Sequence, residues 1–256
     1  MRVAILSDVH GNTAALDAVL DDIERAGGVD AYWVLGDLAA MGPDPVGAME
    51  RLNDLKNAIF VRGNTDRYVC GLLDPQKSTE WIASSPGQTS GIVSRLAMLC
   101  WAQGALMASG WLNWLATLGL EHRVTLPDGT RVLLVHAAPG TDDGDGINPG
   151  LQPDALAELV AECEAELLIV GHTHWQLDIS IGKTRIVNLG SVAVPWAGDL
   201  RASYYLLQAD EKGHTLEHRR VDYDHQAVIE QLKRQKHPGA EYLGARYRGE
   251  INNVWS

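Results

Sequence analysis

The sequence predicts an α/β fold in which two β-sheets form the core and helices lie outside them. Within residues 2–61, short apolar runs alternate with amphipathic helical stretches, which indicates a βαβαβ unit with a parallel sheet. Beyond residue 118 the pattern changes to hairpins, which indicates further strands and a second sheet. With 256 residues and 46% hydrophobic content, the chain can bury one sizeable core, so a single domain spanning 1–256 is expected.

The first part of the chain fits the repeated unit of strand and helix. A short apolar run leads into a stretch with apolar residues at helical spacing, and Gly27 and Gly28 mark its end. Pro45 suits the first turn of a second helix, because the first helical position needs no amide hydrogen. The predicted strands are 3–6, 32–35 and 58–61, and the predicted helices are 13–26 and 44–55.

The stretch 68–118 is predicted to be a helical insertion rich in tryptophan, in a chain that has a single Phe. Helical spacing favours packing of its apolar side chains on the core. The alternative is a cap that stacks a nucleobase or another flat leaving group. The side chains concerned are Trp81, Trp101, Trp111, Trp114, Leu115, Leu118, Met98 and Met107.

Three hairpins, one helix and one buried strand are predicted between 120 and 221. Turn residues such as Pro127-Asp128-Gly129 separate the strands of each hairpin. The hairpin strands are 120–126 with 130–135, 176–181 with 185–188, and 203–208 with 215–221. A helix at 153–165 and a buried strand at 167–170 lie between the first two hairpins, and a last helix near 224–235 opens a C-terminal tail to 256.

Charge and composition exclude some classes of partner. A net charge of −12 and a pI near 5.1 argue against long nucleic acids, whose binding needs a basic surface. The apolar region 92–120 is interrupted by residues such as Arg95, so no membrane span is expected. The odd set of Cys70, Cys100 and Cys163 lacks CxxC spacing, which predicts reduced, buried thiols in a cytoplasmic protein. Nothing in the sequence indicates an oligomeric state.

Polar blocks follow the predicted strands and suggest a two-metal site. Since each block stands where a buried strand ends, the loops can converge at one edge of a sheet. A mixed set of imidazoles and oxygens, with Asp37 able to bridge, suits two divalent ions about 3.5–4 Å apart. Mn, Fe, Ni and Zn all accept such ligands. The candidate ligands are Asp8, His10, Asp37, Asn64, His136, His172 and His174.

These blocks, in this order, resemble the calcineurin-like metallophosphoesterase superfamily from Arg2 to about Val194. Gly11-Asn12 and Gly42-Pro43 look most like its small bacterial and archaeal phosphodiesterase branch. The resemblance implies an α/β/β/α sandwich. The blocks that carry the resemblance are Ser7-Asp8-Val9-His10-Gly11-Asn12, Leu35-Gly36-Asp37, Val61-Arg62-Gly63-Asn64-Thr65-Asp66, Val135-His136, Gly171-His172-Thr173-His174 and Asn188-Leu189-Gly190-Ser191-Val192.

The resemblance also implies a division of ligands between two ions and hydrolysis by a metal-bound hydroxide. Asp37 would bridge the ions, and Asp37, Asn64 and His136 would be the catalytic residues. One ion would be held by Asp8, His10, Asp37 and His174, and the other by Asp37, Asn64, His136 and His172. Period-2 geometry at a strand end would turn His172 and His174 to one side.

Neighbouring residues allow more than one interpretation. Asn12 and Arg62 are predicted to touch a substrate phosphate, but a helix N-cap and a strand-end salt bridge explain them equally well. The acidic loop 142–145 is interpreted as a solvated loop near the pocket mouth rather than a calcium site. Gly190 and Ser191 are expected to shape the loop behind the metals.

Thr65 departs from the family pattern. Many members carry His at this position, where it is thought to protonate the leaving oxygen. A threonine hydroxyl cannot donate a proton efficiently near neutral pH, so the general acid is in doubt. Asp66, the next residue, is expected to be structural.

The sequence therefore predicts a dinuclear-metal phosphoesterase, and most simply a phosphodiesterase acting on a small phosphodiester or nucleotide-like substrate. One alternative is a phosphomonoesterase, including a protein phosphatase. Another is a non-catalytic interaction scaffold on the same fold, as retromer-associated relatives are thought to be. Intact ligands at all seven positions disfavour the scaffold, because a binding surface alone needs no such set.

Overall fold

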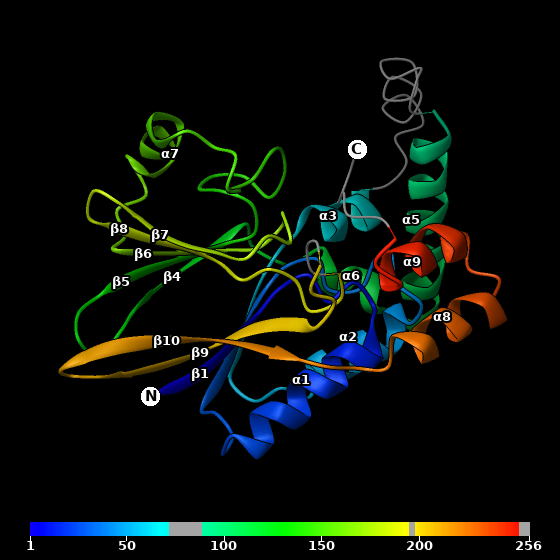
Figure 1. Cartoon of the computed structure of the whole chain (residues 1–256), viewed down its shortest axis with the longest axis horizontal. Coiled ribbons are helices and arrows are strands. Elements are labelled where there is room, and N and C mark those ends of the chain that lie inside the picture. Colours follow the sequence, from blue (N-terminus) through cyan, green and yellow to red (C-terminus); the bar gives the residue numbers. More distant parts are fainter. Residues whose placement is uncertain (72–88, 195–197, 251–256) are drawn as a thin grey trace.

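The computed structural model describes residues 1–71, 89–194 and 198–250, and it contains two mixed five-stranded sheets (Figure 1). The first sheet has the strand order β10-β9-β1-β2-β3, and the second has the order β4-β5-β6-β8-β7. Strands β1, β2 and β3 are parallel neighbours, as the βαβαβ pattern predicts. The strands of the first sheet are β1 (Arg2–Leu6), β2 (Ala31–Leu35), β3 (Ala58–Val61), β9 (Ala202–Asp210) and β10 (Gly213–Val221).

The second sheet contains two of the three predicted hairpins, and β9 with β10 is the third. In this sheet β5, β6 and β8 run parallel, and β4 and β7 pair antiparallel at its edges. Its strands are β4 (Glu121–Thr125), β5 (Arg131–Val135), β6 (Leu167–Val170), β7 (Leu177–Ile181) and β8 (Thr184–Asn188).

The two sheets pack face to face, and the alternation of side chains along β1 explains how. Val3 and Ile5 belong to the core between the sheets, whereas Ala4 and Leu6 belong to the core between the first sheet and its helices. A third core lies between the second sheet and helix α7 (Pro153–Val160). This α/β sandwich with helices outside both sheets confirms the predicted fold class.

The other helices lie on the side of the first sheet, where Figure 1 shows them gathered opposite α7. Asn12 caps the first of them by accepting a hydrogen bond from the Ala15 amide at 3.1 Å. The helices are α1 (Thr13–Arg25), α2 (Pro45–Asn53), α3 (Asn64–Gly71), α5 (Thr89–Ser109), α6 (Trp111–Leu115), α8 (His225–Arg234) and α9 (Ala240–Tyr247).

The tryptophan-rich segment packs on the core in the part that the structure describes. The Trp114 ring meets Phe60 edge-on, with centroids 5.1 Å apart, and Leu115 is fully buried. Trp111 is partly buried against the same cluster, and Trp101 lies edge-on to His237. These contacts favour core packing over an aromatic cap, while Trp81 lies outside the described residues.

Two predictions about helices are wrong. The helix expected at 153–165 ends at Val160, and Glu164 adopts a left-handed conformation with φ 50° that no helix continues. The C-terminal segment was expected to hold one helix and a tail, but α9 follows α8. The pattern in α9 is weak because Gly244 interrupts an eight-residue segment, although Leu243 and Tyr247 recur at helical spacing.

Helix α5 bears on two predictions. Its stretch Gly91–Ser109 is long and apolar enough to cross a membrane by length and composition, and 28% of it is buried. Its inner face, which includes Met98 and Leu106, packs in the core, so a single helix of this kind is weak support for a span.

Cys163 is buried as predicted, but Cys100 on α5 is exposed and Cys70 is half-buried, which corrects the prediction of three buried thiols.

Candidate metal centre

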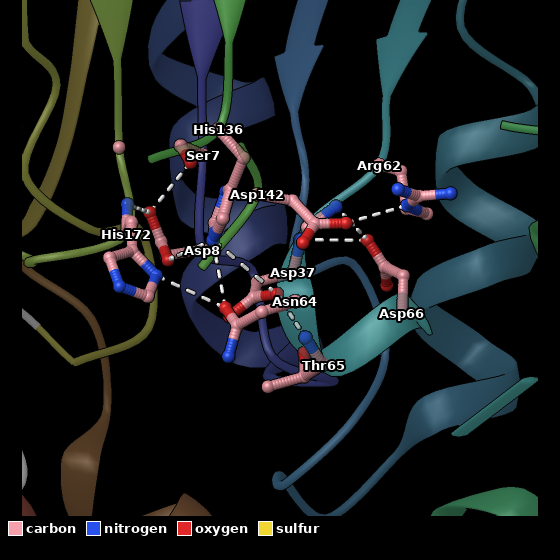
Figure 2. Close-up of polar contacts among 12 residues, drawn as sticks. Ser7, Asp8, Asp37, Arg62, Asn64, Thr65, Asp66, His136, Asp142 and His172 are labelled. Atoms are coloured by element: carbon pink, nitrogen blue, oxygen red, sulfur yellow. Dashed lines mark hydrogen bonds and ion pairs between the residues drawn. The ribbon is translucent and has the colours of Figure 1, made fainter. Parts of the chain in front are cut away.

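Seven predicted ligands meet where strands of both sheets end. Figure 2 shows Asp8, Asp37, Asn64, His136 and His172 among them. Asp8 and His10 follow β1, Asp37 follows β2, and Asn64 begins α3 directly after β3. From the second sheet, His136 follows β5, and the loop after β6 supplies His172 and His174. The carboxyl ends of parallel strands point to one edge, which brings together side chains as distant in sequence as Asp8 and His172.

The first cluster contains Asp8, His10 and His174, all of them buried. The Nε2 atoms of His10 and His174 lie 3.1 Å apart. The Asp8 Oδ1 atom lies 3.1 Å from His174 Nε2 and 3.8 Å from His10 Nε2. Three donor atoms therefore surround one small volume.

The second cluster is built around the Asn64 side chain. Its Oδ1 atom lies 3.2 Å from His136 Nε2 and 3.1 Å from His172 Nδ1, and Figure 2 shows both contacts. Asp37 Oδ1 is 3.5 Å from His136 Nε2. Asp8 Oδ1 is 4.0 Å from the same nitrogen, so Asp8 borders both clusters.

Asp37 lies between the two clusters. Its Oδ2 atom is 3.6 Å from His10 Nε2 in the first cluster, while its Oδ1 faces His136 in the second. The Thr65 amide donates to Oδ1 at 2.9 Å and fixes the orientation of the carboxylate. One oxygen directed at each cluster is the geometry that the predicted bridging role requires.

Backbone carbonyls hold all four imidazoles. A carbonyl oxygen only accepts, so the ring nitrogen that faces it carries a proton, and in the neutral ring the other nitrogen is a lone pair. In its neutral form each ring therefore presents a bare nitrogen to the centre, as metal-binding histidines do, and at His136 a metal ion would take the place of the second proton. The pairs are His10 Nδ1 with Ala40 O at 3.0 Å, His136 Nδ1 with Leu35 O at 2.7 Å, His172 Nε2 with Gly144 O at 2.8 Å, and His174 Nδ1 with Val194 O at 2.8 Å.

This arrangement fits divalent cations. Two bare nitrogens 3.1 Å apart, those of His10 and His174, repel each other unless a cation lies between them. Asp8 Oδ1 is a buried carboxylate oxygen without a hydrogen-bond donor among the described residues. A buried acceptor of this kind is costly unless a cation satisfies it. The donor set thus matches borderline metals such as Mn, Fe, Ni or Zn.

Charge in the centre also favours cations. Burial raises the pKa of Asp8, but the imidazoles of His174 and His136 outweigh burial and lower it below its usual range. Burial lowers the pKa of His136, but the carboxylates of Asp37 and Asp8 outweigh it and raise this pKa to about 10. The two carboxylates therefore stay ionised and attract positive charge.

The backbone of the centre is strained. Five of the seven candidate ligands are non-glycine residues with φ between 47° and 66°, a region that L-residues rarely adopt. His172 and His174 are among them, so the loop after β6 and not period-2 strand geometry directs them, which corrects the prediction. Each reaches a different cluster. The five are Asp8, His10, Asp37, His172 and His174.

Glycines and one asparagine support the ligands. A methyl group at Gly171 would overlap Ser7 Oγ and Asp8 Oδ2. Asn188 is fully buried, and its amide donates to Gly171 O at 2.8 Å and Thr173 Oγ1 at 2.9 Å, which shapes the loop that holds both histidines. Sequence reasoning gave Asn188 no role of its own, since only the fold brings it to that loop.

Ser191 and Asp66 have the structural roles that the sequence predicts. The Ser191 hydroxyl donates to Asp8 O at 3.0 Å and accepts from the Val194 amide. It therefore joins the loop of Asp8 to the segment whose Val194 carbonyl contacts His174. The Asp66 carboxylate accepts from the amides of Asp37, Leu38 and Gly63. Burial and the charge of Asp37 raise the pKa of Asp66 to about 7.

The structural alternatives explain Asn12 and Arg62. Asn12 is fully buried and caps α1, and its Nδ2 lies 3.4 Å from the hydroxyls of Tyr223 and Tyr247. Arg62 donates to Asp142 at 2.6 Å. Their contact with substrate stays a prediction, and for Asn12 it would require the tyrosines to move.

The acidic loop is not fully solvated, which corrects its interpretation. Asp142 is buried and receives hydrogen bonds from Arg62 and Arg67, while Tyr68 donates to Asp143 at 2.5 Å. The loop lies beside the centre as expected, because Gly144 supplies the carbonyl that His172 contacts. Charge pairing with the region around α3 therefore positions the predicted ligand His172.

Thr65 lies beside Asp37 but offers no proton donor of suitable pKa. Its side chain is buried, and its hydroxyl has no hydrogen-bond partner among the described residues. The missing general acid therefore stays an open feature of the centre.

A small pocket adjoins the first cluster and was not predicted. His10 and His174 line one side, and Tyr242, Arg246 and Tyr247 of α9 line the other. Arg246 is 5% exposed. Its charge acts to lower the pKa of Tyr247, although burial outweighs this effect and raises that pKa overall.

Comparison with known proteins agrees with this centre. A family model described as the calcineurin-like phosphoesterase superfamily domain matches residues 1–212. The chain is 29% identical to uncharacterized protein MJ0912 of Methanocaldococcus jannaschii over 95% of this chain and 96% of that one. A metallophosphoesterase from Sphaerobacter thermophilus, 27% identical, superposes with a TM-score of 0.73 over 98% of this chain and 99% of that one.

A more distant relative has a named activity. The chain is 28% identical to a symmetrical bis(5'-nucleosyl)-tetraphosphatase of Paracidovorax citrulli. The alignment covers 65% of this chain and 52% of that protein, so about half of the relative's length is matched.

Proposed function

Because the chain belongs to the calcineurin-like phosphoesterase superfamily, we propose that it is a phosphodiesterase acting on a small phosphodiester or a nucleotide-like ester. Family membership makes it a metal-dependent hydrolase of phosphoric esters. The observation that carries the proposal is the set of four imidazoles directed at one centre. The Nε2 atoms of His10, His136 and His174 lie within 3.6 Å of a carboxylate oxygen of Asp8 or Asp37, and His172 Nδ1 lies 3.1 Å from Asn64 Oδ1.

Two divalent ions in this centre would neutralise the phosphate's charge and lower the pKa of a bound water. The first ion would be held by Asp8, His10, Asp37 and His174, and the second by Asp37, Asn64, His136 and His172. The residues of the chain hold these groups in place. Ser7 Oγ and the His172 amide both donate to Asp8 Oδ2, at 2.6 and 3.1 Å, which leaves Oδ1 for the first ion.

The nucleotide-like part of the proposal draws on the relatives. The Paracidovorax citrulli protein is named for activity on a bis(5'-nucleosyl) tetraphosphate, in which phosphate links two nucleosides. A diester or anhydride of this type carries its charge on compact phosphates, which suits a metal centre in an otherwise acidic protein. Long nucleic acids are not part of the proposal.

The test is a substrate panel with the purified protein and added Mn²⁺, run beside elemental analysis. We expect about two divalent ions per chain and faster cleavage of bis-p-nitrophenyl phosphate than of p-nitrophenyl phosphate. A dinucleoside tetraphosphate and a nucleoside 5'-p-nitrophenyl phosphate belong in the panel. Preference for the monoester would indicate a phosphomonoesterase, and metal-free, inactive protein would indicate a scaffold.

A further inference from the structure

The pocket beside the first cluster is small and closed on one side by α9. It offers about 10 Å³, which is room for roughly one water-sized group. His10, His174 and Arg246 are all among its lining residues. An oxygen atom bound in this space would touch both the predicted metal site and the helix.

Helix α9 turns one face to this pocket. Leu243 and Tyr247 are four residues apart and buried, and Arg246 lies between them on the same side. The Tyr247 hydroxyl lies 3.4 Å from Asn12 Nδ2, and the Tyr223 hydroxyl, which is at the same distance, donates to Ala193 O at 2.8 Å. The Tyr247 contact joins α9 to Asn12, which follows the loop that carries Asp8 and His10. Tyr223 precedes α8 and joins Asn12 to Ala193.

Helix α9 also lies beyond residue 212, where the match to the family model ends. Its contribution to the pocket therefore lies outside the segment that the family model matches, although full-length relatives align over this region as well. Of the side chains that line the pocket, Arg246 is the one with a permanent positive charge.

Resting on the proposed phosphoesterase function, we propose that Arg246 binds a non-bridging oxygen of the phosphate that is cleaved. A guanidinium group is planar and always charged, and it forms short, charge-assisted hydrogen bonds to phosphate oxygens. Oxygens of a transferring phosphoryl group gain charge in the transition state, so such a contact assists both binding and turnover.

The size of the pocket favours the cleaved phosphate over a second one. A separate phosphate group is several times larger than a water molecule and would not fit the space between α9 and the histidines. One oxygen of a phosphate already bound at the metal centre does fit. Arg246 is thus assigned to the reacting phosphate and not to a subsite for a phosphate chain.

The experiment compares Arg246→Met, Arg246→Lys and Arg248→Met with the wild type, all loaded with Mn²⁺. Arg248 is the matched control, because it ends the same helix but is exposed and pairs with Glu250. The first readout is inorganic phosphate binding, measured by the rise in Tm with phosphate concentration. The second is kcat/KM for bis-p-nitrophenyl phosphate, and metal content is measured for each variant.

We expect Arg246→Met to weaken phosphate binding about 10- to 100-fold, the worth of one charged hydrogen bond, with metal content unchanged. The phosphate affinity of Arg246→Lys should lie between those of Arg246→Met and the wild type, since lysine keeps the charge but lacks the paired N–H donors of the guanidinium group. Arg248→Met should bind phosphate within about twofold of the wild type, as expected for an exposed charge. If Arg246→Met fails to fold, Arg246→Lys decides by the same measurement.

Unchanged phosphate affinity in the Arg246 variants would overturn the proposal. So would a loss confined to substrates that carry several phosphates, since that result would place Arg246 at another phosphate. Failure of the proposed function would give a different result. If the wild type cleaves no diester but still binds phosphate more tightly than Arg246→Met, the phosphodiesterase proposal fails and the role of Arg246 in phosphate binding stands.

Discussion

At the scale of single residues, the two oxygens of Asp37 face different clusters, so one carboxylate serves both predicted ions. The other carboxylate, Asp8, has one oxygen engaged by Ser7 and His172 and one left for metal. Loss of charge at Asp37 therefore affects the whole centre, while loss of a single histidine should affect one ion more than the other.

The first prediction is that Asp37→Asn lowers the occupancy of both ions and reduces kcat/KM by more than about 100-fold. Changes to residues that only orient metal ligands cost 10- to 100-fold, so loss of a bridging ligand should cost more. Elemental analysis and a diesterase assay measure the two effects. Asp210→Asn, at the exposed end of β9, is the control, and an Asp37→Asn protein with two ions and full activity would rule out the bridge.

The second prediction concerns the leaving group and rests on Thr65. Without an imidazole to protonate the leaving oxygen, the rate should depend steeply on how well that group carries negative charge. A series of aryl and alkyl phosphodiesters measures this dependence as the slope of log kcat/KM against the leaving-group pKa. Aryl esters should be cleaved much faster than alkyl esters.

The variant Thr65→His should flatten that slope by improving poor leaving groups about 10- to 100-fold. Thr65 is 4% exposed, so the larger ring needs space, and a stability measurement must accompany the kinetics. Thr65→Val removes the hydroxyl at similar volume and should leave the slope unchanged. A flat slope in the wild type would mean that another group is the acid.

At the scale of elements, the loop after β6 is the most constrained part of the site. Gly171 lets this loop pass against Ser7 and Asp8, and Asn188 fixes it from β8. His172 and His174 both have left-handed backbone conformations, and their side chains reach different clusters. The geometry of both predicted ions thus depends on one short connection.

The third prediction is that Gly171→Ala disrupts the centre without removing a ligand. The added methyl group would displace Asp8 or the loop, so metal affinity should fall about 10- to 100-fold. Competition with a chelator measures that affinity. Gly104→Ala in α5 meets open space and should bind metal as the wild type does, and a Gly171→Ala protein that matched it would contradict the close approach.

The sequence predicted most elements and the ligand set, because strands and ligand blocks produce strong local patterns. It missed α9, whose eight residues carry a weak helical pattern, and with it Arg246 and the pocket. It assigned strand geometry to His172 and His174, because backbone strain leaves no trace in residue type other than glycine. The supporting role of Asn188 could not be predicted, because only the fold places β8 beside the loop that carries His172 and His174.

At the scale of the whole molecule, the metal centre joins the two sheets. Asp8, His10, Asp37 and Asn64 follow strands of the first sheet, whereas the other three ligands follow strands of the second. Ions bound by both sets would tie the sheets together at one edge and would also stabilise the strained ligand loops. Metal binding should therefore contribute to the stability of the fold.

The fourth prediction is that removal of metal lowers Tm by about 5–10 °C. Metal at 100 times its dissociation constant stabilises a protein by about 2.7 kcal/mol, and 1 kcal/mol shifts Tm by about 2–4 °C at this size. Calorimetry with and without a chelator measures the shift, and added Mn²⁺ should reverse it. An unchanged Tm after complete removal of metal would show that the ions do not link the sheets energetically.

The candidate ligands and helix α9 lie in different parts of the chain, which bears on how such an enzyme could change its substrate preference. Residues 8–174 supply every candidate ligand for the chemistry, while a helix at 240–247 supplies the opposite wall of the pocket. The Tyr247 hydroxyl of this helix lies 3.4 Å from Asn12 Nδ2, next to the loop that carries Asp8 and His10. If α9 meets the substrate as proposed, exchange of this helix between relatives would change the contacts to the substrate and leave the candidate ligands in place.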